Sequence, residues 1–328
     1  MTTRHATEGA TAPLQVSDAD PRVHELFAGD VVETLVDHGT GLLEGVTWLP
    51  GRSMLVFNDI AGATTYGYRD GVLSVLRRGN RQSNGMTLDA HGRLLICEHA
   101  TSAVVRQDYD GSFEVLAERV GGKQLNSPND VVATTDGRIY FTDPYFGREP
   151  YFGVEREPEL DYCAVFMLPA GGGGPIAVAD DFSGPNGLCF SPDGRRLYVN
   201  DTLRMQIRVF GVRPDGRLDD GELFAQMPGE PDVGAGVPDG MKCDERGNVY
   251  CSGPGGLWIF TPAGERLGIV HVHERAVNFC FGGPHRNELF IAGANGLLDP
   301  GTDRGWIYRI EMAVRGAAPA YLVEGMDV

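Results

Sequence analysis

The sequence predicts an all-β fold, a six-bladed β-propeller with four antiparallel strands in each blade, and three observations support this prediction. A unit made of one polar residue, a short apolar run, a tight turn and a second apolar run occurs six times in the 328 residues. Each unit is long enough for about four short strands, the number found in a propeller blade. The 46 glycines and 20 prolines are scattered along the chain, as many turns require.

The polar residues that open the six units are called the heads here, and we expect them to meet at one end of the propeller axis. They lie 40, 45, 57, 53 and 39 residues apart, so the units differ mainly in their connections. The heads are Glu44, Asn84, Asn129, Asn186, Asp239 and Asn278.

The third unit shows the expected order of strands within a blade. Residues 129–134 read as a first strand, Asp136-Gly137 as the turn, and residues 138–142 as the second strand. Residues 162–168 and 176–179 then supply the third and fourth strands. The fourth unit repeats this order, with strands expected over 186–191, 197–200, 206–212 and 222–225.

The two ends of the chain have different expected roles. Residues 1 to about 25 are polar and aperiodic, which predicts a flexible lead-in, and residues 26–328 are expected to form a single propeller domain. A ring of sheets must be closed by pairing its ends. We therefore expect residues 31–36 to complete the last blade beside C-terminal strands, which would remove exposed sheet edges.

Polar residues also end several of the second strands. Because the first two strands of a blade are antiparallel, the end of the second lies beside the start of the first. A second tier of polar side chains is therefore expected around the heads. The longest connection on this side, residues 144–161, carries Tyr145, Phe146, Tyr151 and Phe152 and is predicted to form a lid or substrate wall. The second-tier residues are Asn58, Glu98, Asp143 and Asn200.

Composition excludes several classes of protein. A formal net charge of −17 disfavours a nucleic-acid partner, which would need clustered Lys and Arg. No apolar stretch approaches the roughly 20 residues of a membrane span, and the N-terminus lacks an apolar signal core. A cytoplasmic enzyme without a nucleic-acid or membrane partner is therefore expected. The sequence does not indicate the oligomeric state.

Familiar catalytic motifs are missing from the sequence. The six cysteines lie singly in apolar strands without a CxxC pair, which indicates reduced core thiols rather than a zinc site or a disulfide framework. The sequence contains no GxSxG elbow and no GxGxxG between a strand and a helix. A serine hydrolase and a nucleotide-dependent enzyme are therefore disfavoured.

The six heads supply hard oxygen donors, two carboxylates and four carboxamides. Such donors suit Ca²⁺, Mg²⁺ or Mn²⁺, although zinc also accepts carboxylate oxygen. Any single Asn or Asp before a glycine is more often a turn residue than a ligand. Six at the same place in a repeat are harder to explain as turns, and a turn would not require glutamate at position 44.

Four segments resemble the gluconolactonase, regucalcin and senescence-marker-protein family of six-bladed propellers. They are LLEGVTWLP, LNSPNDVVATTDGRIYFTDPYFG, GPNGLCFSPDGRRLYVNDT and GVPDGMKCDERGNVY, and the resemblance covers residues 35–310. It implies one divalent metal ion at the base of an axial pocket. By this resemblance Glu44, Asn186 and Asp239 correspond to metal ligands, and Asn129 to a residue that binds either the metal or the substrate. Calcium is the expected metal, with zinc, magnesium and manganese as alternatives.

The expected function is that of a metal-dependent hydrolase that opens a small-molecule lactone, sugar-derived or similarly hydroxylated. The metal would polarise the carbonyl as a Lewis acid. Asp239 is the candidate catalytic residue, and three roles stay open: general base for water, orienting group for a hydroxide ion on the metal, or nucleophile. Phosphotriester or phosphofluoridate hydrolysis on the same scaffold and a non-catalytic calcium-binding propeller are the alternatives.

Further residues are expected near the substrate. His99 follows Glu98 at the mouth and is expected to bind a substrate hydroxyl or shuttle a proton. Arg204 is a rim candidate, whereas Asp143 and Asp201 are expected to tie their strand ends to backbone amides. Ser127 stands where some sugar-lactonase members of the family carry arginine, which argues against the usual sugar lactone. The candidate substrate-binding residues are Asn84, His99, Asn129, Tyr145 and Asn278.

Overall fold

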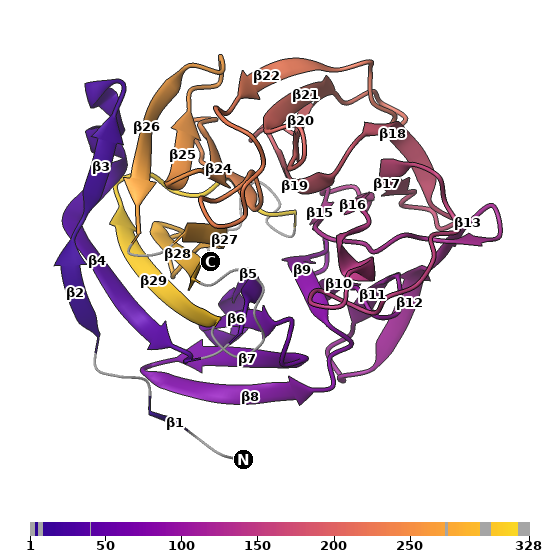
Figure 1. Cartoon of the computed structure of the whole chain (residues 1–328), viewed down its shortest axis with the longest axis horizontal. Coiled ribbons are helices and arrows are strands. Elements are labelled where there is room, and N and C mark those ends of the chain that lie inside the picture. The colour runs from indigo at the N-terminus through magenta and orange to yellow at the C-terminus, as the bar shows by residue number, and fades with distance from the viewer. Residues whose placement is uncertain (1–3, 6–8, 40, 273–274, 296–302, 321–328) are drawn as a thin grey trace.

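The computed structural model describes residues 4–5, 9–39, 41–272, 275–295 and 303–320, and it confirms the six-bladed β-propeller. Six antiparallel sheets stand around a central axis, and each contributes one blade (Figure 1). The first strand of each blade lies nearest the axis, and the later strands follow towards the outside in sequence order, except that β4 from the N-terminal part of the chain is the fourth strand of the last blade. The heads therefore belong to the innermost layer of the molecule.

The strands of the first three blades follow the predicted order. Blade 1 consists of β5 (Leu43–Leu49), β6 (Met54–Asp59), β7 (Thr64–Arg69) and β8 (Val72–Arg78), with β1 (Arg4–His5) at its edge. Blade 2 consists of β9 (Ser83–Leu88), β10 (Leu94–Glu98), β11 (Ala103–Gln107) and β12 (Phe113–Ala117). Blade 3 consists of β15 (Val131–Ala133), β16 (Ile139–Asp143), β17 (Cys163–Leu168) and β18 (Ile176–Phe182).

The other three blades use the same arrangement. Blade 4 consists of β19 (Pro185–Phe190), β20 (Arg196–Asp201), β21 (Gln206–Gly211) and β22 (Glu222–Gln226). Blade 5 consists of β23 (Met241–Cys243), β24 (Val249–Gly253), β25 (Gly256–Phe260) and β26 (Arg266–His271), with β3 (Gln15–Asp18) outside it. Blade 6 consists of β27 (Arg275–Gly282), β28 (Glu288–Asn295), β29 (Arg304–Met312) and β4 (Phe27–Asp37), with β2 (Ala10–Pro13) outside it.

The elements outside the blades are short. A hairpin of β13 (Arg119–Val120) and β14 (Lys123–Gln124) connects blades 2 and 3. Three 3-10 helices, η1 (Pro21–Leu26), η2 (Pro50–Arg52) and η3 (Phe146–Arg148), complete the described elements. Within the part of the chain that the structure describes, no helix is long and apolar enough to cross a membrane.

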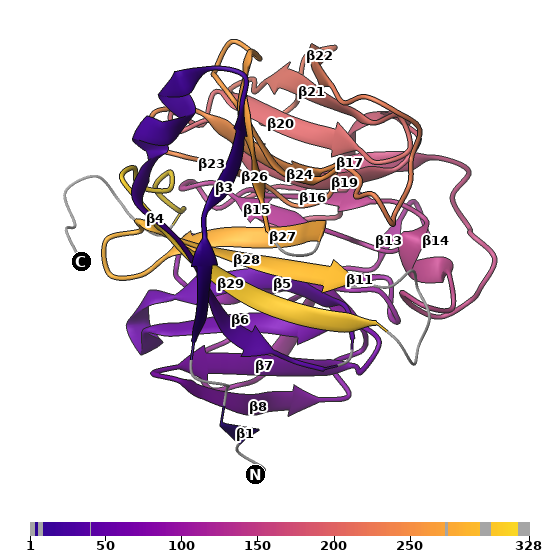
Figure 2. The same ribbon diagram turned by 60° about the vertical axis from the view of Figure 1, so that its left-hand side comes forward.

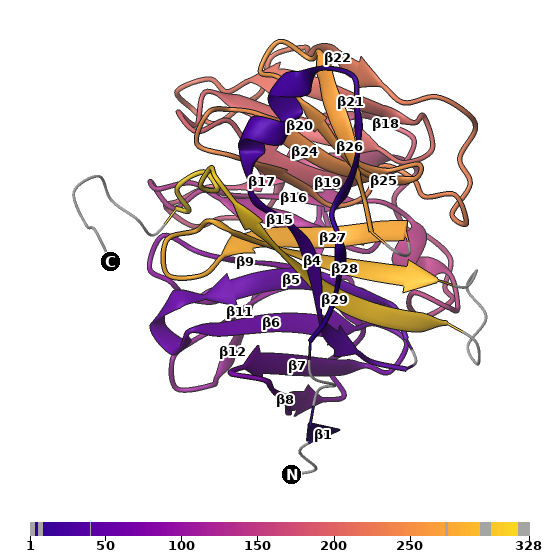
Figure 3. The same ribbon diagram turned by 90° about the vertical axis from the view of Figure 1, so that its left-hand side faces the viewer.

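The ring closes as the sequence predicts, by antiparallel pairing of β4 with β29. The flexible lead-in expected over residues 1–25 is not what the structure shows for residues 10–26. There β2 pairs with β4, β3 pairs with β26, and η1 connects β3 to β4. Figure 3 shows this segment running over the outside of blades 5 and 6. Its strands are four residues long and lack an apolar stripe, so their pairing depends on sheet edges that are distant in the sequence.

Apolar side chains fill the space between neighbouring blades. At the seam between the last and first blades, Trp48 of β5 stacks on Phe290 of β28 at a ring-centroid distance of 5.6 Å. Leu55 and Phe57 of β6 share this core cluster with Ile307 of β29. Figure 2 shows β27 to β29 lying next to β5 to β8 at this seam. Blade-to-blade packing thus holds the inner strands, and with them the heads, in fixed positions.

Glycines that follow the heads have a packing role rather than a turn role. A Cβ atom at Gly45 would lie 2.0 Å from the backbone oxygen of Asn84, the head of the next blade. A Cβ at Gly187 would likewise lie 2.0 Å from the backbone oxygen of Asp239. Only glycine allows the inner strands to approach this closely. The reading of these dipeptides as turn residues is therefore wrong, because they belong to the inner layer of the propeller.

Candidate functional site

Five of the six heads line one cavity of about 140 Å³ on the axis. The sixth, Asn278, is not among the described residues that line it. Asn278 instead donates a hydrogen bond from Nδ2 to Oε2 of Glu44 at 2.7 Å, and this bond joins the last blade to the first. The heads therefore converge as predicted, with Asn278 beside the cavity rather than on its wall. The five lining heads are Glu44, Asn84, Asn129, Asn186 and Asp239.

Hydrogen bonds between neighbouring blades fix the backbone of the inner layer. In four blades a side chain on the second strand donates to a backbone oxygen at or next to the head of the following blade. Asn58 and Asn200 of the predicted second tier act in this way. Glu98 instead forms an ion pair with Arg77 at 3.0 Å. The donor and acceptor pairs are Asn58 and Asn84 (2.8 Å), Thr142 and Asn186 (2.7 Å), Asn200 and Asp239 (2.5 Å), and Ser252 and Val277 (2.8 Å).

Asp143 and Asp201 tie strand ends to backbone amides, as predicted. The carboxylate of Asp143 accepts from the backbone N–H groups of Asn126 and Ser127, both at 2.8 Å. The carboxylate of Asp201 accepts from the N–H groups of Ser183 (2.7 Å) and Gly184 (3.0 Å). Burial raises the pKa of Asp143 to about 7, although both backbone bonds act in the opposite direction. Both aspartates thus support the loops around the mouth.

The two acidic heads share one buried region. Burial raises the pKa of Glu44 well above its usual range, and the negative charges of Asp239 and Asp130 raise it further. Burial also raises the pKa of Asp239 to about 7, while the guanidinium of Arg275 lowers it. Two carboxylates that destabilise each other's ionised form become compatible when a cation lies between them. The electrostatics of the heads therefore fit a bound divalent cation.

The donor set also fits such an ion. Glu44 and Asp239 supply carboxylate oxygens, and Asn129 and Asn186 supply amide oxygens around the same cavity. Calcium and magnesium prefer oxygen ligands of this kind. No cluster of three or more His, Cys, Asp or Glu side chains that could hold a metal occurs in the described ranges. Amide oxygens would therefore have to complete the coordination shell.

His99 lies beside the cavity with both ring nitrogens engaged. Nδ1 lies 2.8 Å from the backbone oxygen of Phe152, and Nε2 lies 3.2 Å from Nδ2 of Asn84. Since a carbonyl only accepts, Nδ1 carries the proton, and Nε2 accepts from the amide of Asn84. Burial lowers the pKa of His99 to about 4, so the ring is neutral near pH 7. This geometry makes His99 a link between the wall of blade 2 and the loop that covers the mouth.

That loop, residues 144–161, crosses the mouth and attaches to other blades. Arg148 anchors its start by donating to the backbone oxygens of Leu125 (2.9 Å) and Asn126 (3.0 Å). The hydroxyl of Tyr151 donates to Oδ2 of Asp303, which lies just before β29. Tyr151 and Phe152 pack against a buried cluster that contains Leu42, Ile60, Val277 and Ala294. The loop that was predicted to form a lid or substrate wall therefore contributes Phe146 and Phe152 to the wall of the cavity.

Two residues expected near the substrate lie elsewhere. Tyr145 is not among the described residues that line the cavity, and its hydroxyl donates to the backbone oxygen of Leu160 at 3.1 Å. Arg204 donates to Oγ of Ser183 at 2.9 Å and to the backbone oxygen of Asp181 at 2.7 Å, and it does not belong to the described lining either. Sequence position placed both residues on the right loops but could not show where their side chains point.

Sequence reasoning missed one charged residue of the cavity and most of its wall. Arg275 lines the cavity three residues before the head of blade 6, and its Nη1 donates to the backbone oxygen of Val233. Its place at the start of an inner strand was a signal that could have identified it. The apolar wall comes from separate connections that share no spacing. Its larger members are Leu42, Ile60, Phe146, Phe152, Leu203 and Val237.

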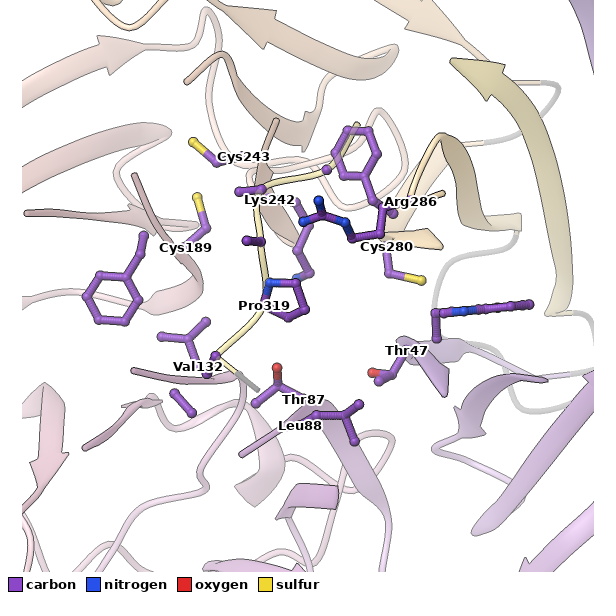
Figure 4. A pocket seen from close by; sticks show the side chains of 18 of the residues that line it. Thr47, Thr87, Leu88, Val132, Cys189, Lys242, Cys243, Cys280, Arg286 and Pro319 are labelled. Atoms are coloured by element: carbon purple, nitrogen blue, oxygen red, sulfur yellow. The ribbon is translucent and has the colours of Figure 1, made fainter. Parts of the chain in front are cut away.

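A second cavity, of about 190 Å³, lies further along the same inner strands, beyond the heads (Figure 4). Cys189, Cys243 and Cys280 surround it, together with Lys242 and with Pro319 of the C-terminal segment. The described residues that line it include no Asp, Glu or His. Burial raises the pKa of Cys280 to about 12, so its thiol is protonated near pH 7. Among the described residues, the carboxylates that suit a hard divalent cation therefore lie at the end of the axis that carries the heads.

Fold and cavity together define a six-bladed β-propeller with an acidic, amide-rich site on its axis. Residues 42–295 match the sequence profile described as the SMP-30/Gluconolactonase/LRE-like region. The chain belongs to this family, which confirms the resemblance found in the sequence. A gluconolactonase from Zymomonas mobilis is 31% identical over 276 residues, which cover 78% of this chain and 77% of that protein.

Two solved structures resemble this chain, one in sequence and fold and the other in fold. A gluconolactonase from Xanthomonas campestris is 34% identical and superposes with a TM-score of 0.82, over 94% of this chain and 99% of that one. A regucalcin from Agrobacterium tumefaciens, described as a calcium-binding protein, is 20% identical with a TM-score of 0.72, over 90% of this chain and 98% of that one. The second likeness shows the fold alone.

Proposed function

We propose that this protein is a lactone hydrolase whose site is the cavity formed by the heads, with a divalent cation held by Glu44, Asn129, Asn186 and Asp239. The observation that carries the proposal is the convergence of the buried carboxyl group of Glu44, the partly buried carboxyl group of Asp239 and two amides at the base of one axial cavity. Family membership and the similarity to two gluconolactonases support the reaction class. Calcium is the proposed cation because all four side chains supply oxygen ligands.

The cation and the protein residues have separate tasks in this proposal. When bound, a divalent cation supplies Lewis-acid polarisation of the lactone carbonyl. Asp239 is the proposed acceptor of a proton from the attacking water, because its carboxyl group lines the cavity beside the other heads. Arg275 favours the ionised form of Asp239 through its positive charge. The amide of Asn278 holds one oxygen of Glu44 in place.

The reaction balances without a further reactant. The water oxygen bonds to the carbonyl carbon, and one water proton passes to Asp239. The ring C–O bond then breaks, and the proton returns to the former ring oxygen. The product is a hydroxy acid. Asn84 and Asn129 line the cavity beside this centre and are the proposed contacts for the polar atoms of the lactone ring.

The test is Asp239→Asn, with Asp244→Asn as its matched control. Asp244 is a second aspartate of blade 5, but it is buried and lies in the turn after β23, at the other end of the strand. Loss of a general base typically costs about 10²–10⁴-fold in rate. We expect such a loss of kcat with Asp239→Asn and retained kcat with Asp244→Asn, measured by proton release from lactones in weak buffer. Full activity of Asp239→Asn would contradict the assigned role.

Metal removal and substrate range separate this proposal from its alternatives. Exhaustive chelation should abolish turnover, and added calcium should restore it. Turnover by protein with no measurable bound metal would exclude a metal-dependent reaction. Hydrolysis of phosphotriesters with no hydrolysis of lactones would replace the proposed reaction with phosphoester chemistry. Calcium binding without turnover of any substrate would indicate a binding protein.

Single turnover in ¹⁸O-water distinguishes a base from a nucleophile, because only direct attack by Asp239 would place the label in the protein.

A further inference from the structure

The wall of the cavity differs sharply from its base. The base consists of the polar heads, whereas the wall above them is built mainly from apolar side chains. Phe146 and Phe152 come from the loop over residues 144–161, and Leu42, Ile60, Leu203 and Val237 come from four other connections or strand ends. Five separate segments thus contribute apolar surface to the same space. Such a wall is typical of a pocket that binds the apolar part of a ligand.

Apart from the guanidinium of Arg275, the polar groups of the wall are largely used within the protein. Both ring nitrogens of His99 are engaged by Asn84 and Phe152. The hydroxyl of Thr202 donates to the backbone oxygen of Pro238 at 2.6 Å and accepts from Asn186 at 3.1 Å. Each substrate hydroxyl that loses water without gaining a partner costs about 1–3 kcal/mol. A lactone with several hydroxyl groups would therefore leave them poorly satisfied against this wall.

The size of the cavity points in the same direction. Its volume is about 140 Å³. A dry cavity of about 150 Å³ lined by leucine, isoleucine and phenylalanine accommodates one benzene molecule. The space above the heads is therefore suited to one five- or six-membered ring, and a short substituent would extend into the mouth beside the exposed Leu203.

Leu203 shows that apolar surface is kept available at the mouth. It is 49% exposed, although it lines the cavity. It follows Asp201 and Thr202, whose polar bonds hold the end of β20 in place. Leu203 and Phe146 both lie over Gly184, where a Cβ atom would come within 2.9 Å of each. Exposed leucine is unfavourable in water, and its contact with a bound apolar group would remove that cost.

We propose that the substrates are compact apolar lactones, with a five- or six-membered ring and a short alkyl or aryl substituent, rather than polyhydroxylated sugar lactones. This inference rests on the proposed lactone hydrolysis and specifies its substrate class. The ester group meets the heads at the base, and the hydrocarbon part meets the wall.

The first experiment compares lactones of the same ring size on the calcium-loaded protein. The panel contains δ-valerolactone, δ-hexalactone, δ-octalactone and glucono-1,5-lactone, and each kcat/KM is divided by the uncatalysed hydrolysis rate of the same lactone. Burial of one methylene is worth about 0.8 kcal/mol, or about fourfold. We expect the ratio to rise about fourfold per added carbon until the cavity is full. We expect glucono-1,5-lactone to fall at least about tenfold below δ-hexalactone.

The second experiment uses a matched pair of exposed leucines from blade 4. Leu203 lies at the mouth, and Leu223 lies on outer strand β22 and is 58% exposed. Leu203→Asn should lower kcat/KM for δ-hexalactone about fourfold or more and leave glucono-1,5-lactone unchanged or improved. Leu223→Asn should change neither. Because both leucines are exposed, neither variant removes a core side chain.

The outcomes separate the substrate class from the reaction. Preference for glucono-1,5-lactone over the alkyl lactones would overturn the apolar substrate class and leave lactone hydrolysis intact. Equal effects of Leu203→Asn and Leu223→Asn on δ-hexalactone would also overturn it, because apolar surface at the mouth would then contribute nothing to substrate binding. Failure to hydrolyse any lactone would overturn the proposed function itself, and the substrate class with it.

Discussion

The side-chain amide of Asn278 donates to Oε2 of Glu44 at 2.7 Å, across the seam between the last and the first blade. The backbone N–H of Gly45 donates to the same oxygen at 3.0 Å. Both bonds use Oε2, which leaves Oε1 for a cation. Asn278 thus positions a proposed metal ligand without lining the cavity itself, and it couples the closure of the ring to the geometry of the site.

This relationship predicts that Asn278→Ala weakens cation binding. Removal of a hydrogen bond that orients a metal ligand typically costs about 10–100-fold in affinity. We expect a loss of this size in the calcium affinity, measured by calorimetric titration of chelator-treated protein.

Asn248→Ala is the control for this change. The Nδ2 atom of Asn248 donates to Oδ2 of Asp244, also at 2.7 Å. This bond lies in the turn after β23, at the end of blade 5 away from the heads. The same truncation there should leave calcium affinity unchanged. Equal affinities of the two variants would show that Asn278 does not position a ligand.

A second prediction concerns the stability of the metal-free protein against pH. The pKa of Asp239 is about 7 in the folded state, above its ordinary value of 3.8. Between these values the folded chain binds more protons than the unfolded chain, so stability falls as pH rises from about 4 to 7. Urea unfolding in the presence of chelator should show this fall, with a size of no more than a few kcal/mol.

Asp239→Asn should remove this component, because an amide does not titrate. The variant should also lose the stabilisation by calcium, which for wild type reaches about 2.7 kcal/mol at 100 times the dissociation constant. If calcium stabilised wild type and Asp239→Asn equally, the assignment of Asp239 as a ligand would fail.

A third prediction gives the opposite pH dependence for His99. Its pKa is lowered by burial to about 4, below the ordinary value of 6.5. Between these values the unfolded chain binds more protons, so the contribution of His99 to stability is complete above about pH 6.5 and is lost as pH falls towards 4. The full difference amounts to about 3 kcal/mol.

The measurement compares wild type with His99→Gln by urea unfolding at pH 4.5 and pH 7.5. The stability difference between the two proteins should shrink at the lower pH, because only wild type must keep a buried imidazole neutral. His285→Gln, at an exposed histidine, serves as the control and should show no such change. A constant difference for His99→Gln across the pH range would contradict this prediction.

The fold and the base of the site could be predicted because both depend on the repeat. A head that recurs once per blade must meet its equivalents at the axis, so Glu44 and Asp239 could be brought together although they are distant in the sequence. Asn58 and Asn200 were found by the same reasoning, since their distance from the head is fixed by a short hairpin.

The features that the sequence did not reveal have no periodicity. Strands β2 and β3 are stabilised by the edges of blades 5 and 6, which only the closed ring provides. Phe146 reaches the cavity while its neighbour Tyr145 does not, because the loop turns into η3 between them. Asn278 lies within the expected ring, but its bond to Glu44 depends on how the first and last blades meet.

A fourth prediction concerns the spacing of the inner strands. A Cβ atom at Gly187 would lie 2.0 Å from the backbone oxygen of Asp239 and 2.9 Å from Nδ2 of Asn200. Gly187→Ala should therefore separate blades 4 and 5 and destabilise the protein by about 1–3 kcal/mol or more. Thermal unfolding should show a lower melting temperature, and calcium titration should show a lower affinity, because the displaced backbone carries Asp239.

Gly174→Ala is the control, since no atom lies within 4 Å of a Cβ there. Equal melting temperatures of the two variants would refute the packing role.

The last prediction tests the loop over residues 144–161 as a cover of the mouth. Tyr151 attaches this loop to blade 6 through its hydrogen bond to Asp303, and the loop also contributes Phe152 to the cavity wall. Tyr151→Phe removes only the hydroxyl, so the ring should stay in its apolar cluster while the loop opens more often. We expect faster backbone hydrogen exchange over residues 146–154 and a several-fold lower kcat/KM for lactones. Calcium affinity should be unchanged, because the heads do not depend on this bond.

Tyr109→Phe, which removes a hydroxyl bonded to the backbone oxygen of His91 at an exposed turn, should change none of these quantities. Unaltered exchange in Tyr151→Phe would show that the remaining anchors, Arg148 and His99, hold the loop by themselves.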